Sequence, residues 1–447
     1  MKTYDIQEPR FTCFASAWLS KFVTKHPIVA NRLRWWVGIF LVLPFPFSAP
    51  AQPDACSLGW QLTSSDSPFG DFHTWYLIGQ ASAYDSRRHV PVVFGGLLVD
   101  PNGRNVPFDS GTWEWNGTQW EEPLHFVEPP PRSDAAMAYD DARGVCVLFG
   151  GHLNNLAFND TYEWDGSKWI FRQAFDPTAT DRPPPTAHPV MAYDSARRLT
   201  VLVENVSGKT WEWDGAIWSS HPTTPPSRIH SAMVYDPIRQ VTVLFGGQSD
   251  VPPYNFLNDT QTWDGRNWTQ VSTGGPAPRY DHAMAYDSHR KVIVLFGGTA
   301  SDVIDDQLGD TWEWDGQSWA PQLDAGRFGL GPREGSTMWY DAVQQRLMVF
   351  GGGRYLPVGG GVYKGNFPND VWEARPPGYW VDFNAPGLPG FPETGYFNEP
   401  FNTLAEAVTS ANAGCTLNLK AGSRAETITI SKPLTLEAFF GPATIGQ

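Results

Sequence analysis

The chain repeats one phrase six times, a short apolar segment that ends in Tyr-Asp. The tyrosines of successive repeats are 55, 54, 42, 51 and 54 residues apart, and they are Tyr84, Tyr139, Tyr193, Tyr235, Tyr286 and Tyr340. A period of about fifty residues with strand-like content is typical of a β-propeller with one blade per repeat. The sequence therefore predicts an all-β, six-bladed propeller in which most recurring residues serve the fold.

The fifth repeat indicates how each blade is built. Residues 283–286 predict a short first strand, 287–290 form a turn, and the β-branched apolar run 291–296 predicts a second strand. The alternation in 310–314 predicts a third, half-buried strand. The Asp-Gly pair that follows is typical of a two-residue hairpin turn, after which a fourth strand begins. Each repeat is thus one sheet of four antiparallel strands.

Two glycine motifs recur through the repeats. The turn before the fourth strand appears as Asn116-Gly117, Asp165-Gly166, Asp214-Gly215, Asp264-Gly265 and Asp315-Gly316. A glycine pair ends the second strand at Gly95-Gly96, Gly150-Gly151, Gly246-Gly247, Gly297-Gly298 and Gly351-Gly352. With these motifs, residues 57–380 resemble the kelch-repeat family of β-propellers.

Two repeats depart from this pattern. The third has Glu204 and Asn205 where the glycine pair belongs, and the sixth has Ala374-Arg375 in place of Trp-Asp. Both keep an outer tryptophan, Trp218 and Trp380. The segment around Trp60 precedes the first Tyr-Asp and looks like a spare fourth strand. The resemblance implies that this segment closes the ring by completing the sixth blade.

Variable segments fall at one end of the predicted blades. The strand order places the Asp-x-x-Arg and Asp-Gly turns at one end, and the loops after the glycine pairs at the other. The loops that vary in length are 97–110, 152–158, 248–257, 299–308 and 353–368. Repeat scaffolds commonly bind through the face that carries such loops, so we expect the ligand on this loop face.

Four repeats carry an arginine five residues before the methionine of the first strand, namely Arg132, Arg228, Arg279 and Arg333. His188 and His230 lie two positions further along their repeats, and His282 lies three further along. We predict that these seven residues bind ligand at the mouth of the central channel, where guanidinium groups would suit a carboxylate or sulfate. The kelch resemblance implies an alternative, in which the arginines support the fold by bonding carbonyls of neighbouring blades or carboxylates such as Asp281 and Glu334.

Three classes of function stay open, and the third is a purely structural role in the cell envelope. We expect a non-catalytic scaffold that binds a protein or glycan, with no catalytic residue, metal or cofactor. Kelch-like enzymes are the alternative, but copper radical oxidases use a channel cysteine, whereas Cys146 lies within an apolar strand run. A carbohydrate-active enzyme of the sugar mutarotase or epimerase type needs an acid–base pair beside an arginine. His230, His282 and Glu334 are its candidates.

Residues 1–51 differ from the rest of the chain. A basic region precedes an apolar run at 35–47 and the small residues 48–51, as in a secretory signal peptide. We therefore expect a secreted, periplasmic or cell-envelope protein that does not insert into the membrane after cleavage, with an uncleaved anchor as the alternative. The whole chain carries −15 and residues 1–51 carry +4, so the remainder carries −19. This charge makes nucleic acid an unlikely partner.

The repeats stop after Trp380. Residues 381–401 are rich in Pro and Gly and predict a linker, and strand-like segments follow at 416–420, 427–430 and 434–438. The stretch 400–407, with 443–446, resembles the first coil of a pectin-lyase-like parallel β-helix. The resemblance implies a small β-helix-like module over residues 402–447.

Overall fold

The computed structural model describes residues 59–64, 76–99, 105–108, 110–124, 127–207, 209–301, 306–322, 330–359, 362–366, 369–375, 379–381, 403–404, 407–408, 416–424 and 435–445. The predicted signal peptide and most of the predicted linker lie outside these residues. No helix among them is long and apolar enough to cross a membrane.

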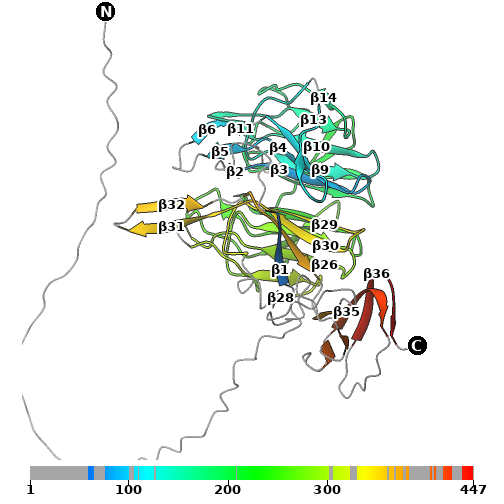
Figure 1. Cartoon of the computed structure of the whole chain (residues 1–447). Coiled ribbons are helices and arrows are strands. Elements are labelled where there is room, and N and C mark those ends of the chain that lie inside the picture. The colour runs from blue at the N-terminus through cyan, green and yellow to red at the C-terminus, as the bar shows by residue number, and fades with distance from the viewer. Residues whose placement is uncertain are drawn as a thin grey trace, which may run out of the picture. The chain divides into compact units, whose positions relative to one another are not determined.

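Six antiparallel sheets of four strands follow one another along the chain (Figure 1). The first three blades are β3 (Ala81–Asp85), β4 (Val90–Phe94), β7 (Thr112–Trp115) and β8 (Trp120–Glu121); β9 (Ala136–Asp140), β10 (Val145–Phe149), β13 (Thr161–Trp164) and β14 (Trp169–Gln173); and β15 (Val190–Asp194), β16 (Leu199–Val203), β17 (Thr210–Trp213) and β18 (Trp218–His221). The fourth and fifth are β20 (Ala232–Asp236), β21 (Val241–Phe245), β23 (Thr260–Trp263) and β24 (Trp268–Ser272), and β25 (Ala283–Asp287), β26 (Val292–Phe296), β27 (Thr311–Trp314) and β28 (Trp319–Gln322). The predicted six-bladed propeller is confirmed.

The sixth blade combines the two ends of the propeller. It contains β29 (Thr337–Asp341), β30 (Arg346–Phe350) and β33 (Val371–Arg375), and its outermost strand is β1 (Gly59–Ser64). Figure 1 shows β1, in blue, among the yellow strands of this blade. The innermost strands contact one another in sequence from β3 to β29, and β29 contacts β3. The ring is therefore closed, as the segment around Trp60 predicted.

Four small sheets lie at the loop face. They are built from β2 (Tyr76–Ile78), β5 (Leu97–Val99) and β6 (Asn105–Phe108); β11 (His152–Leu153) and β12 (Leu156–Ala157); β19 (Arg228–Ile229) and β22 (Gln248–Ser249); and β31 (Arg354–Gly359) and β32 (Val362–Asn366). All of these strands precede an innermost strand or follow a second strand. They therefore lie at the end of the blades where the sequence placed the variable loops.

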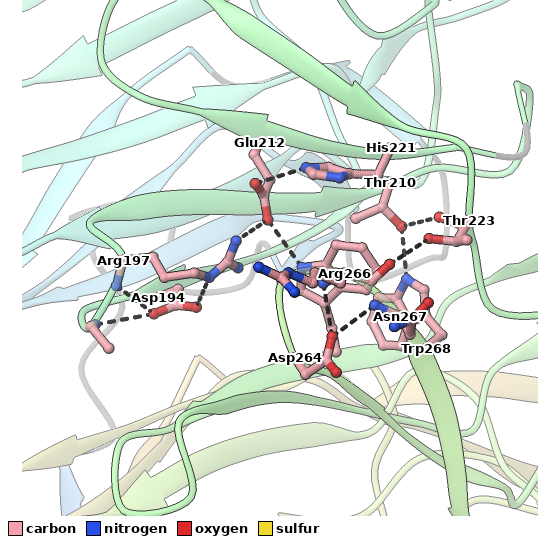
Figure 2. A network of polar contacts seen from close by, with 12 residues as sticks. Asp194, Arg197, Thr210, Glu212, His221, Thr223, Asp264, Arg266, Asn267 and Trp268 are labelled. Carbon is pink, nitrogen blue, oxygen red and sulfur yellow. Dashed lines mark hydrogen bonds and ion pairs between the residues drawn. The ribbon is translucent and has the colours of Figure 1, made fainter.

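Polar contacts between blades hold the ring together, as Figure 2 shows for the third and fourth blades. Arg197 pairs with Asp194 of its own turn at 2.7 Å and with Glu212 at 2.5 Å. Trp263 of the next blade donates from Nε1 to the same Glu212 carboxylate at 3.0 Å. Because these groups are largely removed from water, the charges must be matched within the fold. The repeated Trp-Glu and Asp-x-x-Arg motifs are thus structural, as expected from their recurrence.

Tryptophans of the fourth strands make a second set of contacts between blades. Five of the six donate from Nε1 to the threonine that begins the third strand of the preceding blade. The pairs are Trp169–Thr112, Trp218–Thr161, Trp268–Thr210, Trp319–Thr260 and Trp60–Thr311. The sixth blade has Val371 at the threonine position, and the buried Nε1 of Trp120 has no hydrogen-bond partner in the described part of the chain.

The C-terminal segment forms a parallel sheet of β34 (Tyr379–Val381), β35 (Thr416–Arg424) and β36 (Thr435–Ile445). Trp380 was predicted as the outer tryptophan of the sixth blade, and this is wrong, because its strand pairs with β35 while β1 fills the outer position. The strands predicted at 416–420 and 434–438 correspond to β35 and β36. The segment 427–430 lies outside the described residues, and the β-helix itself stays a prediction.

Candidate functional site

A ring of six equivalent residues surrounds the loop-face mouth of the central channel. Each stands five positions before the tyrosine of its repeat, and in blade order they are Gly79, Asp134, His188, His230, Asp281 and Gly335. All six line one cavity of about 1090 Å³. Residues from the loop-face segments, including Leu97 and His152, complete its wall. The cavity is therefore formed by all six blades and opens where the variable loops are.

Backbone hydrogen bonds connect these ring residues from blade to blade. Asp134 donates its amide to the Gly79 carbonyl at 2.7 Å, Asp281 donates to the His230 carbonyl at 3.0 Å, and Gly335 donates to the Asp281 carbonyl at 2.8 Å. Asp134, His230 and Asp281 all have φ between 53° and 56°. This left-handed conformation is tolerated by Asp and Gly and is uncommon for other residues. The ring positions are thus set by contacts between blades.

The side chains of the ring form a cluster of histidines and carboxylates. His230 Nδ1 lies 2.7 Å from Asp281 Oδ1. The rings of His188 and His230 are 4.1 Å apart, centroid to centroid. On the other side of His188, His152 Nδ1 lies 3.6 Å from Asp134 Oδ2. The cluster therefore runs without a break from the second blade to the fifth.

The two adjacent histidines have opposite pKa shifts. Burial alone would lower the pKa of His230, but the charge of Asp281 and its hydrogen bond outweigh burial, so the pKa is raised. Burial, followed by the charge of His230, lowers the pKa of His188 to about 3. His230 can thus carry a positive charge beside Asp281, whereas His188 is neutral over the physiological range.

Two carboxyl groups of the cavity resist ionisation. Burial and, more weakly, the charge of Asp281 raise the pKa of Asp134, against a lowering hydrogen bond from Ser133. Burial and the Asp281 charge also raise the pKa of Glu334, to about 7. Glu334 precedes Gly335 and belongs to the cavity wall. The site can therefore exchange protons near neutral pH.

The four predicted arginines lie elsewhere. Each is at most 5% exposed and makes a two-pronged contact with an aspartate of its own blade. The pairs are Arg132–Asp160, Arg228–Asp259, Arg279–Asp310 and Arg333–Asp370. Each also donates to the carbonyl of the first glycine in the pair that ends the second strand. This geometry favours the structural alternative, and ligand contact by these arginines stays a prediction.

The aspartate partners were missed, although the repeats contain a signal for them. In the four repeats that carry the arginine, an aspartate immediately precedes the third strand. The first repeat has Leu77 in place of the arginine and Gly111 in place of the aspartate. The third has Thr186 and Lys209 at these positions. Arginine and aspartate are thus present or absent together, which is the behaviour of a contacting pair.

The predicted histidines divide between two environments. His188 and His230 come together in the cavity, as described above. His282 also contributes to the wall, but it is only 6% exposed and its ring packs edge-on against Phe245, 5.4 Å away. Burial and then the charge of Arg279 lower its pKa to about 3. His282 is therefore a neutral core residue.

Among the described residues, no three His, Cys, Asp or Glu side chains gather as a metal ion would require. No family model matches the chain, and no curated protein matches it.

Proposed function

We propose that this chain is an exported propeller of the kelch type that binds a protein or glycan without catalysis. One observation carries the proposal, the cavity of about 1090 Å³ that all six blades form at the loop face. Pockets for small ligands and chain ends commonly have volumes of about 300–1000 Å³. The lining combines apolar residues such as Leu97 with hydrogen-bonding groups such as Gln80, Ser231 and Asn154. Such a mixture suits a polar ligand with apolar faces.

A carbohydrate-active enzyme of the mutarotase or epimerase type is the second candidate. The contact between His230 and Asp281, at 2.7 Å, supports it, because a carboxylate at Nδ1 orients an imidazole for proton transfer through Nε2. Glu334, with a pKa of about 7, would be the partner acid. No arginine lies among the described residues of the cavity wall to receive a substrate carboxylate. Binding is therefore the preferred function.

The C-terminal parallel sheet carries a separate proposal. We propose that β34, β35 and β36 begin a parallel β-helix, because successive parallel strands in register are the repeating unit of that fold.

The test of the binding function is to place a side chain in the cavity wall. A Cβ added at Gly335 would meet no atom within 4 Å, and φ is +68° there. Asparagine tolerates this conformation, and the equivalent Asp134 and Asp281 already adopt it. Gly335→Asn should therefore obstruct the open part of the cavity at Gly335 without unfolding the propeller. The full chain and this variant are compared on arrays of neutral, amino and acidic glycans and of peptides.

Gly117→Asn is the matched control, because Gly117 also has positive φ and open space but lies in a turn at the opposite end of the first blade. We expect hits that Gly335→Asn weakens at least tenfold and Gly117→Asn leaves unchanged. Turnover of a bound sugar would favour the enzyme. If neither substitution changes the affinity for a glycan or peptide on the array, that ligand binds outside the cavity.

A further inference from the structure

Three carboxyl groups line the cavity. Asp134, Asp281 and Glu334 reach it from the second, fifth and sixth blades. Among the described residues of the wall there is no lysine or arginine. The nearby Arg279 belongs to a different layer, where Asp310 already matches its charge. Among the described residues of the wall, the basic groups beside these carboxyl groups are histidines: His230 contacts Asp281 and His152 lies near Asp134.

The pKa shifts of Asp134 and Glu334 bear on the charge that the cavity prefers. The Asp281 charge adds to burial in raising the pKa of both Asp134 and Glu334. Burial opposes a charge of either sign, so only the contribution of Asp281 indicates a negative field in the cavity. That field favours an added positive charge.

The ring also leaves room for a ligand beside these carboxylates. Its two glycines, Gly79 and Gly335, belong to the first and sixth blades, which are neighbours across the closure of the ring. The space next to Gly335 is open, whereas a Cβ at Gly79 would lie 2.8 Å from Asp134 Oδ1. The other ring positions hold Asp or His. The open position is thus Gly335, and the residue before it, Glu334, also lines the cavity.

We propose that this cavity binds an organic cation, a primary ammonium group whose hydrogen-bond acceptor is Glu334, while Asp134 and Asp281 line the same cavity. The inference rests on the proposed function, because it assigns a ligand class to the same site. It reverses the expectation of an acidic ligand, which depended on arginines that are buried in ion pairs. An amino sugar and a lysine side chain offer the same group, and the experiment separates them.

Two matched pairs of probes test the charge. The first pair is 6-amino-6-deoxyglucose and glucose, and the second is Nα-acetyl-lysine methylamide and its Nε-acetylated form. Calorimetric titration of the full chain is performed at pH 8, where Glu334 is mostly ionised and the lysine amine is protonated. We expect at least one amine to bind tenfold or more tightly than its neutral partner. The pair that responds identifies the source of the ammonium group.

Glu334→Gln tests the acceptor. It keeps the shape of the side chain and removes its charge, so amine binding should weaken about tenfold. Glu121→Gln, on exposed β8, is the control and should have no effect. Weakened binding of the amines only would support the inference, whereas equal loss for neutral probes would show that charge is not recognised.

Proton release gives an independent readout. Glu334 faces the charges of Asp281 and His230 and accepts hydrogen bonds from Gln307 and Thr299. Its carboxyl holds a proton below about pH 7, and a bound ammonium must displace this proton. Amine affinity should therefore fall between pH 8 and pH 6 in the native protein and stay level in Glu334→Gln.

The failures of the two proposals are distinguishable. Binding of glucose as tight as that of its amine, abolished by Gly335→Asn, would overturn the ammonium inference and leave the binding function intact. A preference for acidic glycans that Gly335→Asn abolishes would do the same. If neither amine binds up to millimolar concentration, the inference is likewise overturned.

Discussion

Arg132 illustrates how a residue at the channel entrance can make all its polar contacts within its own blade. Its guanidinium donates to both carboxylate oxygens of Asp160, at 2.6 and 2.8 Å, and to the carbonyls of Pro130 and Gly150. The side chain is fully buried and lies 4.2 Å from the ring centre of Phe158. Every nitrogen is thus satisfied within the blade. A ligand carboxylate would have to displace Asp160 from a site closed to water.

Loss of this arginine should therefore destabilise the fold. Arg132→Leu leaves Asp160 buried and unpaired, and breaking a buried ion pair in this way costs about 3–5 kcal/mol. Urea unfolding would measure the change. Arg182→Leu is the comparison, because its partner Asp181 is 69% exposed and stays hydrated when the arginine is removed, so the loss of stability should be smaller. An Arg132→Leu variant of unchanged stability but weaker ligand binding would restore the ligand role.

Sequence reasoning reached the position of these arginines but not their environment. It placed them correctly before the innermost strand, yet position along a strand does not determine where a long side chain extends. The partner Asp160 lies 28 residues away. The six ring residues were easier to predict from the sequence, because aligning the repeats on their tyrosines places Asp134, His188 and Asp281 at the same position. The open space at Gly335 required the three-dimensional structure.

At the scale of the strand, the blades were predictable because the local signals agree. Turn residues, apolar runs and hairpin glycines each indicated the same boundaries. The error at Trp380 has a physical cause, since a tryptophan after the third strand satisfies the pattern whether or not its strand joins the blade. Trp60 satisfies the pattern equally well. The two alternatives differ only in long-range pairing, which a local pattern does not encode.

The third strand of the sixth blade offers a stabilising substitution. Val371→Thr would give Trp120 Nε1 the acceptor that each of the other five fourth-strand tryptophans has. A net hydrogen bond contributes about 0.5–1.5 kcal/mol, so the free energy of unfolding should rise by that amount. The reverse change, Thr311→Val, removes the acceptor of Trp60 and should lower it by about 1–3 kcal/mol. Equal destabilisation by both substitutions would contradict this account.

At the scale of the whole molecule, stability depends on one strand that is not tethered to its blade. β1 joins β33 only through hydrogen bonds and through Trp60, which is 3% exposed and packs against Phe296 at 5.3 Å. In the other blades, a short hairpin tethers the fourth strand to the third. Ring closure is therefore the point where the propeller opens most easily.

Trp60→Ala should thus act differently from the same change in a tethered strand. Truncating a buried tryptophan costs about 3–5 kcal/mol, which we expect for both Trp60→Ala and Trp218→Ala. Only Trp60→Ala should also release its strand, so amides of β33 should exchange hydrogen faster, measured by mass spectrometry. In Trp218→Ala, the amide hydrogens of β17 should exchange only as fast as the lower global stability of the variant predicts. Similar exchange patterns in the two variants would show that closure is not a weak point.

The pairing of Gly59 with Arg375 makes the two ends of the propeller neighbours. The order of blades is linear along the chain but cyclic in space, so a short peptide from residue 375 to residue 59 could replace the present ends. New ends could then be opened at an exposed hairpin such as Asn116-Gly117. A circularly permuted chain of this kind would have every blade tethered except the one chosen to be cut, and the cavity would be unchanged. In a closed ring of six blades, the propeller could therefore begin and end at any one of the six blades.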